Sequence, residues 1–124
     1  MNINKTNINN LFYIYILFNL VIWVLVPTLT NKNLPLDTIE ALAWGSNLEW
    51  GFNKHPPVSA FLAEVFYFFF GSNDWAYYLL SQICVATSFL FVWKLSNNFF
   101  KNQTYSLISV LALEGIFFYN YTTP

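Results

Sequence analysis

Residues 34–62 read LPLDTIEALAWGSNLEWGFNKHPPVSAFL, and this stretch decides how the rest of the chain must fold. It holds the only histidine and three of the six acidic residues, and long apolar runs flank it on both sides. The polar chemistry of the protein is therefore built from this stretch or delivered to it. Pro35 near its start and the pair Pro56–Pro57 near its end interrupt the chain, because proline cannot donate a backbone hydrogen bond inside a helix.

The composition identifies the solvent of most of the chain as a lipid bilayer. The 124 residues are enough for one domain, and 56% of them are hydrophobic while only 9% are charged, against roughly 25% charged in an average soluble domain. The net charge is −1 and arginine is absent, which argues against a nucleic-acid surface. The single Cys84 excludes an intramolecular disulfide.

Residues 11–29 form an uncharged run of about 28 Å as a helix, which nearly matches a hydrocarbon core of about 30 Å. The rival interpretation is a cleaved signal peptide. The run is longer than the usual core of such a peptide, and no small-x-small cleavage site follows it. We therefore predict a retained first transmembrane helix.

Two further spans are predicted downstream. Residues 75–93 carry no charge, with a tryptophan at each end as an interface anchor. Residues 94–104 form a polar turn. Residues 105–121 form the third span, which carries Glu114.

The intervening residues 30–74 form the predicted outer loop. A short helix is expected over 38–49, and a second one over 58–70. The second is intensely apolar, but at about 20 Å it is too short to cross the bilayer, and Glu64 lies midway along it. The predicted fold is thus an all-α integral membrane protein with three transmembrane helices and two short interfacial helices.

The lysines predict the orientation. Lys5 and the turn that contains Lys94 and Lys101 are placed in the cytoplasm by the positive-inside rule. The loop 30–74, with five acidic residues and two lysines, is then extracytoplasmic. This arrangement requires that residues 58–70 do not span the membrane.

Asp37 and Glu40 are the first candidates for chemistry. Their spacing is that of a helix N-cap whose N3 carboxylate reaches back to it. Alternatively, Asp37 acts as a general base just outside the bilayer and takes a proton from an acceptor hydroxyl or amine.

Lys54 and His55 are the second candidates. A cation directly ahead of two prolines at the membrane surface is well placed to hold a lipid-linked phosphate. The alternative is an ordinary loop cation that faces anionic lipid. His55 has no second ligand in its vicinity, so no metal site is predicted from this chain.

Glu114 is a carboxylate inside a predicted span, which is a functional hypothesis in itself and requires a partner or a proton. Gly115 beside it allows a close helix approach. The sequence shows no partner, which leaves a neutral buried acid or a pair with residues beyond this sequence.

The pattern LPLDxxEAxxWGxxLxWGFxKHPPVxAFL resembles the first extracytoplasmic loop of bacterial glycosyltransferase family 39, which is related to protein O-mannosyltransferases and lipid A aminoarabinose transferases. The later LEGIFFYNYTTP, residues 113–124, resembles the end of the third helix in one branch of that family. The resemblance covers nearly the whole chain.

The resemblance implies a membrane enzyme of the GT-C class on the bacterial cytoplasmic membrane. Such an enzyme moves a sugar from a polyprenyl-phosphate donor to a lipid A-type or protein acceptor on the outer face. It implies that Asp37 is the loop acid that acts on the acceptor, and that Lys54 and His55 face the donor phosphate. The family usually has the second acid directly after the first, whereas here Thr38 intervenes and the glutamate is Glu40. No cofactor is implied from this chain, although a divalent metal is compatible with the complete enzyme.

Family members are several times longer, so residues 1–124 are expected to be the N-terminal part of such an enzyme's membrane domain. The isolated chain is expected to be inactive, because three helices cannot enclose donor and acceptor away from water. The alternative is a small non-catalytic multi-span membrane protein that acts as an assembly partner.

Overall fold

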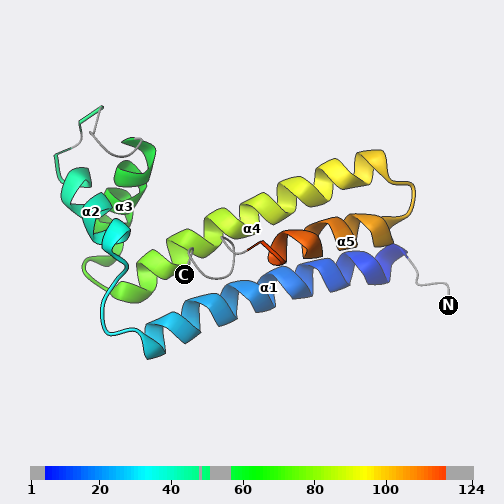
Figure 1. Cartoon of the computed structure of the whole chain (residues 1–124), viewed down its shortest axis with the longest axis horizontal. Coiled ribbons are helices and arrows are strands. Elements are labelled where there is room, and N and C mark those ends of the chain that lie inside the picture. The colour runs from blue at the N-terminus through cyan, green and yellow to red at the C-terminus, as the bar shows by residue number, and fades with distance from the viewer. Residues whose placement is uncertain (1–4, 48, 51–56, 117–124) are drawn as a thin grey trace.

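The computed structural model describes residues 5–47, 49–50 and 57–116. Helices are the only regular elements in these residues, which confirms the predicted all-α class. They are α1 (Lys5–Thr30), α2 (Leu36–Gly45), α3 (Pro57–Phe70), α4 (Asp74–Phe99) and α5 (Gln103–Glu114). Figure 1 shows α1, α4 and α5 side by side along the length of the molecule, with α2 and α3 together at one end.

Two helices in the described part of the chain are long and apolar enough to cross a membrane. They are Asn7–Thr30 and Asp74–Phe99, which contain the predicted spans 11–29 and 75–93. α4 continues through Lys94 to Phe99, so the turn that was predicted over 94–104 is confined to residues 100–102. The prediction was wrong there because it ended the helix at its first charge, whereas a helix can continue after its side chains leave the hydrocarbon.

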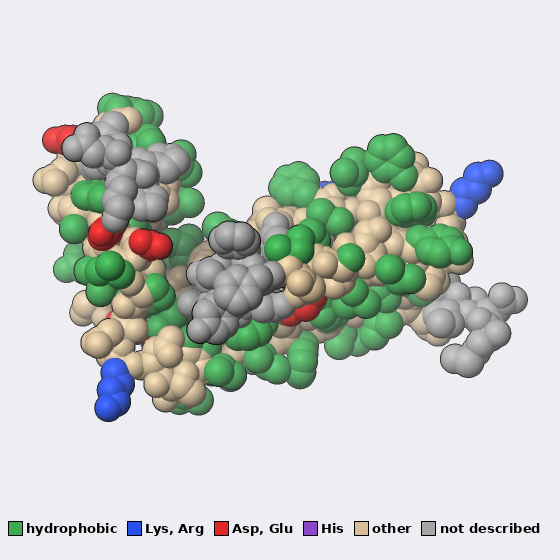
Figure 2. Space-filling model, in the orientation of Figure 1, with side chains coloured by type: hydrophobic (Ala, Val, Ile, Leu, Met, Phe, Trp, Pro, Cys, Tyr) green, Lys and Arg blue, Asp and Glu red, His purple; other side chains and the backbone are tan. Residues whose placement is uncertain are grey.

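α1 and α4 run antiparallel and share one core with α5. The rings of Phe12 and Trp93 stack with centroids 4.2 Å apart, and Val110 of α5 is fully buried against them. The outer faces of these helices remain apolar. Phe18 and Leu29 are 63% and 81% exposed, and hydrophobic side chains line much of the surface in Figure 2. These faces suit contact with lipid.

The third predicted span is not confirmed. α5 has 12 residues, or about 18 Å, which is well short of a hydrocarbon core of about 30 Å. It begins where the Asn102 side chain accepts a hydrogen bond from the Thr104 backbone N–H at 3.0 Å. It ends at Glu114, with Gly115 as its C-cap. Residues 117–121 of the predicted span lie outside the described residues.

α2 begins earlier and ends earlier than predicted. Its N-cap is Pro35, whose carbonyl oxygen accepts from the backbone N–H groups of Thr38 and Ile39. Asp37 therefore lies inside the first turn and not at the N-cap position. The prediction of a capping box formed by Asp37 and Glu40 is wrong. The fixed φ of Pro35 lets the helix take Pro35 as its N-cap, two residues before Asp37.

α3 agrees with the prediction of a short apolar helix. Its 14 residues reach about 21 Å, and it stops at Gly71, whose φ of +63° only glycine adopts readily. Because α1 and α4 are antiparallel, the described residues between them, which include α2 and α3, lie at one end of the molecule (Figure 1). The structure therefore fits a loop on one side of the membrane.

Candidate functional site

A pocket of about 260 Å³ lies where α2 and α3 meet the beginning of α4. The side chains that line it come from all three helices and include carboxyl, hydroxyl and thiol groups. They are Asp37, Thr38, Ala41, Ser59, Leu62, Ala63, Tyr77, Leu80, Ser81 and Cys84. On the face drawn in Figure 2, acidic side chains gather over this end of the molecule.

Asp37 contributes the carboxylate of this pocket. It stands in the first turn of α2. The hydroxyls of Thr38, Ser59 and Ser81 lie around the same space, while Leu62 and Leu80 supply apolar wall. A carboxylate beside hydroxyl groups and an apolar surface can accept a proton from a bound hydroxyl and hold a small polar molecule in one orientation.

The wall between α2 and α3 depends on Gly45. This residue is buried, and a Cβ atom added to it would lie 2.6 Å from the carbonyl oxygen of Ala60 and 3.0 Å from Cβ of Glu64. The two helix backbones therefore approach more closely than any other residue allows. This contact holds the C-terminal end of α2 against α3.

The predicted site residues fall into three groups. Asp37 lines the pocket, whereas Glu40, one turn further along α2, is half-buried and is not among the lining residues. Lys54 and His55 lie outside the described residues. Sequence reasoning missed Ser59 and Ser81. Ser59 follows the two prolines closely enough to be suspected, but nothing in the local pattern distinguishes Ser81 from any other serine in a transmembrane helix.

The described residues bring no three His, Cys, Asp or Glu side chains together in an arrangement that could hold a metal ion. The pocket has one carboxylate and one thiol, Asp37 and Cys84, among its lining residues. That set is a poor match for a divalent cation, which takes several oxygen ligands.

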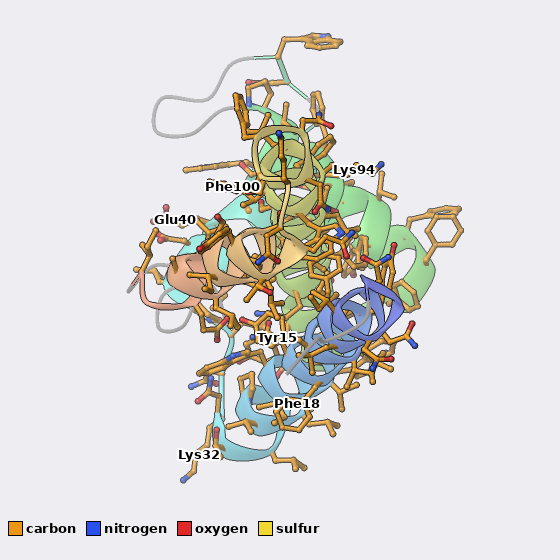
Figure 3. All side chains as sticks on the ribbon, turned by 90° about the vertical axis from the view of Figure 1, so that its right-hand side faces the viewer. Tyr15, Phe18, Lys32, Glu40, Lys94 and Phe100 are labelled. Atoms are coloured by element: carbon orange, nitrogen blue, oxygen red, sulfur yellow. The ribbon has the colours of Figure 1, made fainter. Side chains whose placement is uncertain are left out.

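A second polar cluster lies inside the helices, at Glu114. The Tyr15 hydroxyl donates a hydrogen bond to its carboxylate, and the Asn19 amide donates to both carboxylate oxygens at 3.1 Å. Figure 3 shows Tyr15 on the side of α1 that faces α5. Two partners of Glu114 that the sequence did not show are therefore on α1, 99 and 95 residues away.

The family model described as dolichyl-phosphate-mannose-protein mannosyltransferase matches residues 54–124. The match begins at Lys54, directly ahead of α3, and includes the α3 and α4 sides of the pocket. No curated protein and no solved structure matches the chain.

Proposed function

Because the chain belongs to the dolichyl-phosphate-mannose-protein mannosyltransferase family, we propose that it carries part of the active site of a membrane glycosyltransferase. The reaction moves a sugar from a polyprenyl-phosphate donor to a protein or lipid acceptor on the outer face of the cytoplasmic membrane. The observation that carries this proposal is the position of Asp37 in a pocket whose α3 and α4 walls fall within the family match.

In the proposed reaction, Asp37 is the general base. An acceptor hydroxyl attacks the anomeric carbon, the bond from that carbon to the phosphate oxygen breaks, and the polyprenyl phosphate leaves with the electron pair. Asp37 takes the proton of the attacking hydroxyl. Thr38, Ser59 and Ser81 offer hydrogen bonds to sugar or acceptor hydroxyls in the same pocket. Glu40 is proposed as a second carboxylate near this site, one helical turn from Asp37.

Lys54 and His55 are proposed to hold the donor phosphate. In the sequence they immediately precede the prolines that lead into α3. Their charge and hydrogen-bond donors suit a phosphate group, and the N-terminal end of a helix also favours an anion. Ser59, in the first turn of α3, lines the pocket that contains Asp37. This arrangement supports a donor phosphate and an acceptor hydroxyl at neighbouring positions.

The test compares Asp37→Asn with Glu49→Gln in membranes, in a full-length enzyme that carries residues 1–124 as its N-terminal part. The probe is radiolabelled polyprenyl-phosphate mannose, the type of donor in the family's name. Asparagine cannot accept the proton, so we expect the transfer rate to fall by ~10² or more. The loss of fold stability should be small, because an exposed first-turn carboxylate contributes only about 0.3–1 kcal/mol.

Glu49 is the matched control, since it is an exposed acid of the same loop outside the pocket. Glu49→Gln should leave both the rate and the amount of protein in the membrane unchanged. An Asp37→Asn protein that transfers sugar at the normal rate would refute the role of Asp37 as the base. A parallel loss of rate and of membrane abundance would assign Asp37 a structural role.

A further inference from the structure

Tyr77 joins the pocket to the turn between α3 and α4. It lines the pocket and is 4% exposed. Its hydroxyl donates a hydrogen bond to the backbone carbonyl oxygen of Gly71 at 2.6 Å. Because that proton is held by Gly71, the hydroxyl is engaged with the backbone and not with the pocket interior.

Several further contacts stabilise the turn at residues 71–73 that receives this hydrogen bond. The Gly71 N–H donates to the carbonyl of Tyr67 at 2.7 Å, and the Asn73 amide donates to the carbonyl of Phe70 at 2.7 Å. The rings of Phe70 and Trp75 meet edge to face with centroids 5.2 Å apart. The Tyr77 hydroxyl adds a hydrogen bond from the second turn of α4 to this corner, beside the ring contact of Trp75.

The angle at this corner controls the width of the pocket. Ser59, Leu62 and Ala63 line it from α3, while Leu80, Ser81 and Cys84 line it from α4. Ser59 is twelve residues from Gly71, or about 18 Å along the helix, so a tilt of roughly 10° would move it by about 3 Å. A displacement of about 1 Å in an active site can already cost a factor of ~10² in rate.

We propose that Tyr77 is a positioning residue for sugar transfer. Its hydrogen bond to Gly71 fixes the angle between α3 and α4, and thereby the separation of the two pocket walls around the substrate. The reaction-level part of this inference rests on the proposed function. The geometric part does not, and it can be measured without any substrate.

The rate at which a maleimide labels Cys84 measures how far the α3 and α4 walls of the pocket are separated. Cys84 is the only cysteine of the chain, it is exposed, and it lines the α4 wall. In Tyr77→Phe the ring still fills its place, but the corner loses its hydrogen bond. We expect a maleimide to label Cys84 several-fold faster than in the unmodified protein. In a full-length enzyme that carries residues 1–124, we also expect kcat/KM for transfer from polyprenyl-phosphate mannose to fall roughly tenfold or more, mainly through kcat.

Tyr78→Phe is the matched control. It removes the hydroxyl of the neighbouring tyrosine, which accepts a hydrogen bond from Asn31 at 3.2 Å and is not part of the pocket lining. It should change neither the labelling of Cys84 nor transfer.

Gly71→Ala changes the backbone of the same turn without removing the Tyr77 hydroxyl. Its added Cβ meets no atom within 4 Å, but its φ of +63° is strained for alanine. It should accelerate labelling as Tyr77→Phe does.

The results separate the two proposals. Unchanged labelling and unchanged kcat/KM in Tyr77→Phe, with transfer abolished by Asp37→Asn, would overturn the role of Tyr77 and leave the proposed function standing. Faster labelling in Tyr77→Phe, with transfer unaffected by Asp37→Asn, would support the geometric role of Tyr77 and overturn the assignment of Asp37. Equal labelling rates in Tyr77→Phe and Tyr78→Phe would also overturn the role of Tyr77.

Discussion

At Gly45 the backbones of α2 and α3 come so close that a side chain has no room there. The space for a Cβ atom is taken by the backbone of Ala60 at 2.6 Å, and a backbone carbonyl cannot rotate away as a flexible side chain would. The packing of α2 against α3 therefore depends on a residue that has no side chain. Gly115 is different. A Cβ atom added there would lie 3.4 Å from the carbonyl oxygen of Ala112, which is an ordinary contact distance.

Gly45→Ala should push α2 away from α3 and lower the stability of the protein by about 1–3 kcal/mol, the usual cost of overpacking. Gly115→Ala is the control, and it should be neutral within about 0.5 kcal/mol. Thermal unfolding in detergent micelles measures both. A Gly45→Ala protein as stable as the Gly115→Ala protein would show that the close approach of α2 and α3 is not needed.

At the scale of elements, α5 is a short helix held against a long one by a polar contact. A single carboxylate, Glu114, receives hydrogen bonds from Tyr15 and Asn19 on α1, and Asn19 is 8% exposed. Hydrogen bonds between helices inside a membrane contribute about 1–2 kcal/mol in model peptides and less in native proteins. The contact thus stabilises one pairing of α5 with α1 in addition to the apolar core.

Tyr15→Phe should lower the stability of the helix bundle by about 1–2 kcal/mol, because it removes one donor to Glu114 and leaves the ring in place. Tyr13→Phe makes the same change two residues away, at a side chain that is 58% exposed on the outer face of α1, and should have no effect. Denaturant titration in micelles would compare the two variants. Equal stabilities would mean that the Glu114 cluster does not hold α5.

At the scale of the whole molecule, the long helices α1 and α4 form one part and the pocket between α2, α3 and the start of α4 lies at one end of them. α1 and α4 run the length of the molecule, and α2 and α3 stand at one end of them (Figure 1). Lys32 follows the end of α1 at the pocket end, and Lys94 lies near the C-terminal end of α4, which is the opposite end of the molecule in Figure 1. We retain the prediction that the pocket end faces outward.

Cysteine labelling in intact cells tests this orientation. In a Cys84→Ser background, Lys32→Cys and Ser72→Cys should react with a membrane-impermeant maleimide, because both positions are exposed at the pocket end. Asn98→Cys, near the far end of α4, should react only after the membrane is opened. Labelling of position 72 from the cytoplasmic side alone would refute the predicted topology.

The sequence by itself determined the class of the fold and the positions of its long helices. Uncharged runs of membrane length predict α1 and α4, and the short run before Gly71 predicts a helix that does not cross, because length and hydrophobicity are local properties. Asp37 was also identified as a candidate from the pattern of neighbouring residues in the sequence. The tertiary structure alone decided that Ser81 and Tyr77 share a pocket with Asp37, and that Tyr15 and Asn19 bind Glu114. Those contacts join residues up to 99 positions apart, and the packing of helices, which no local periodicity encodes, brings them together.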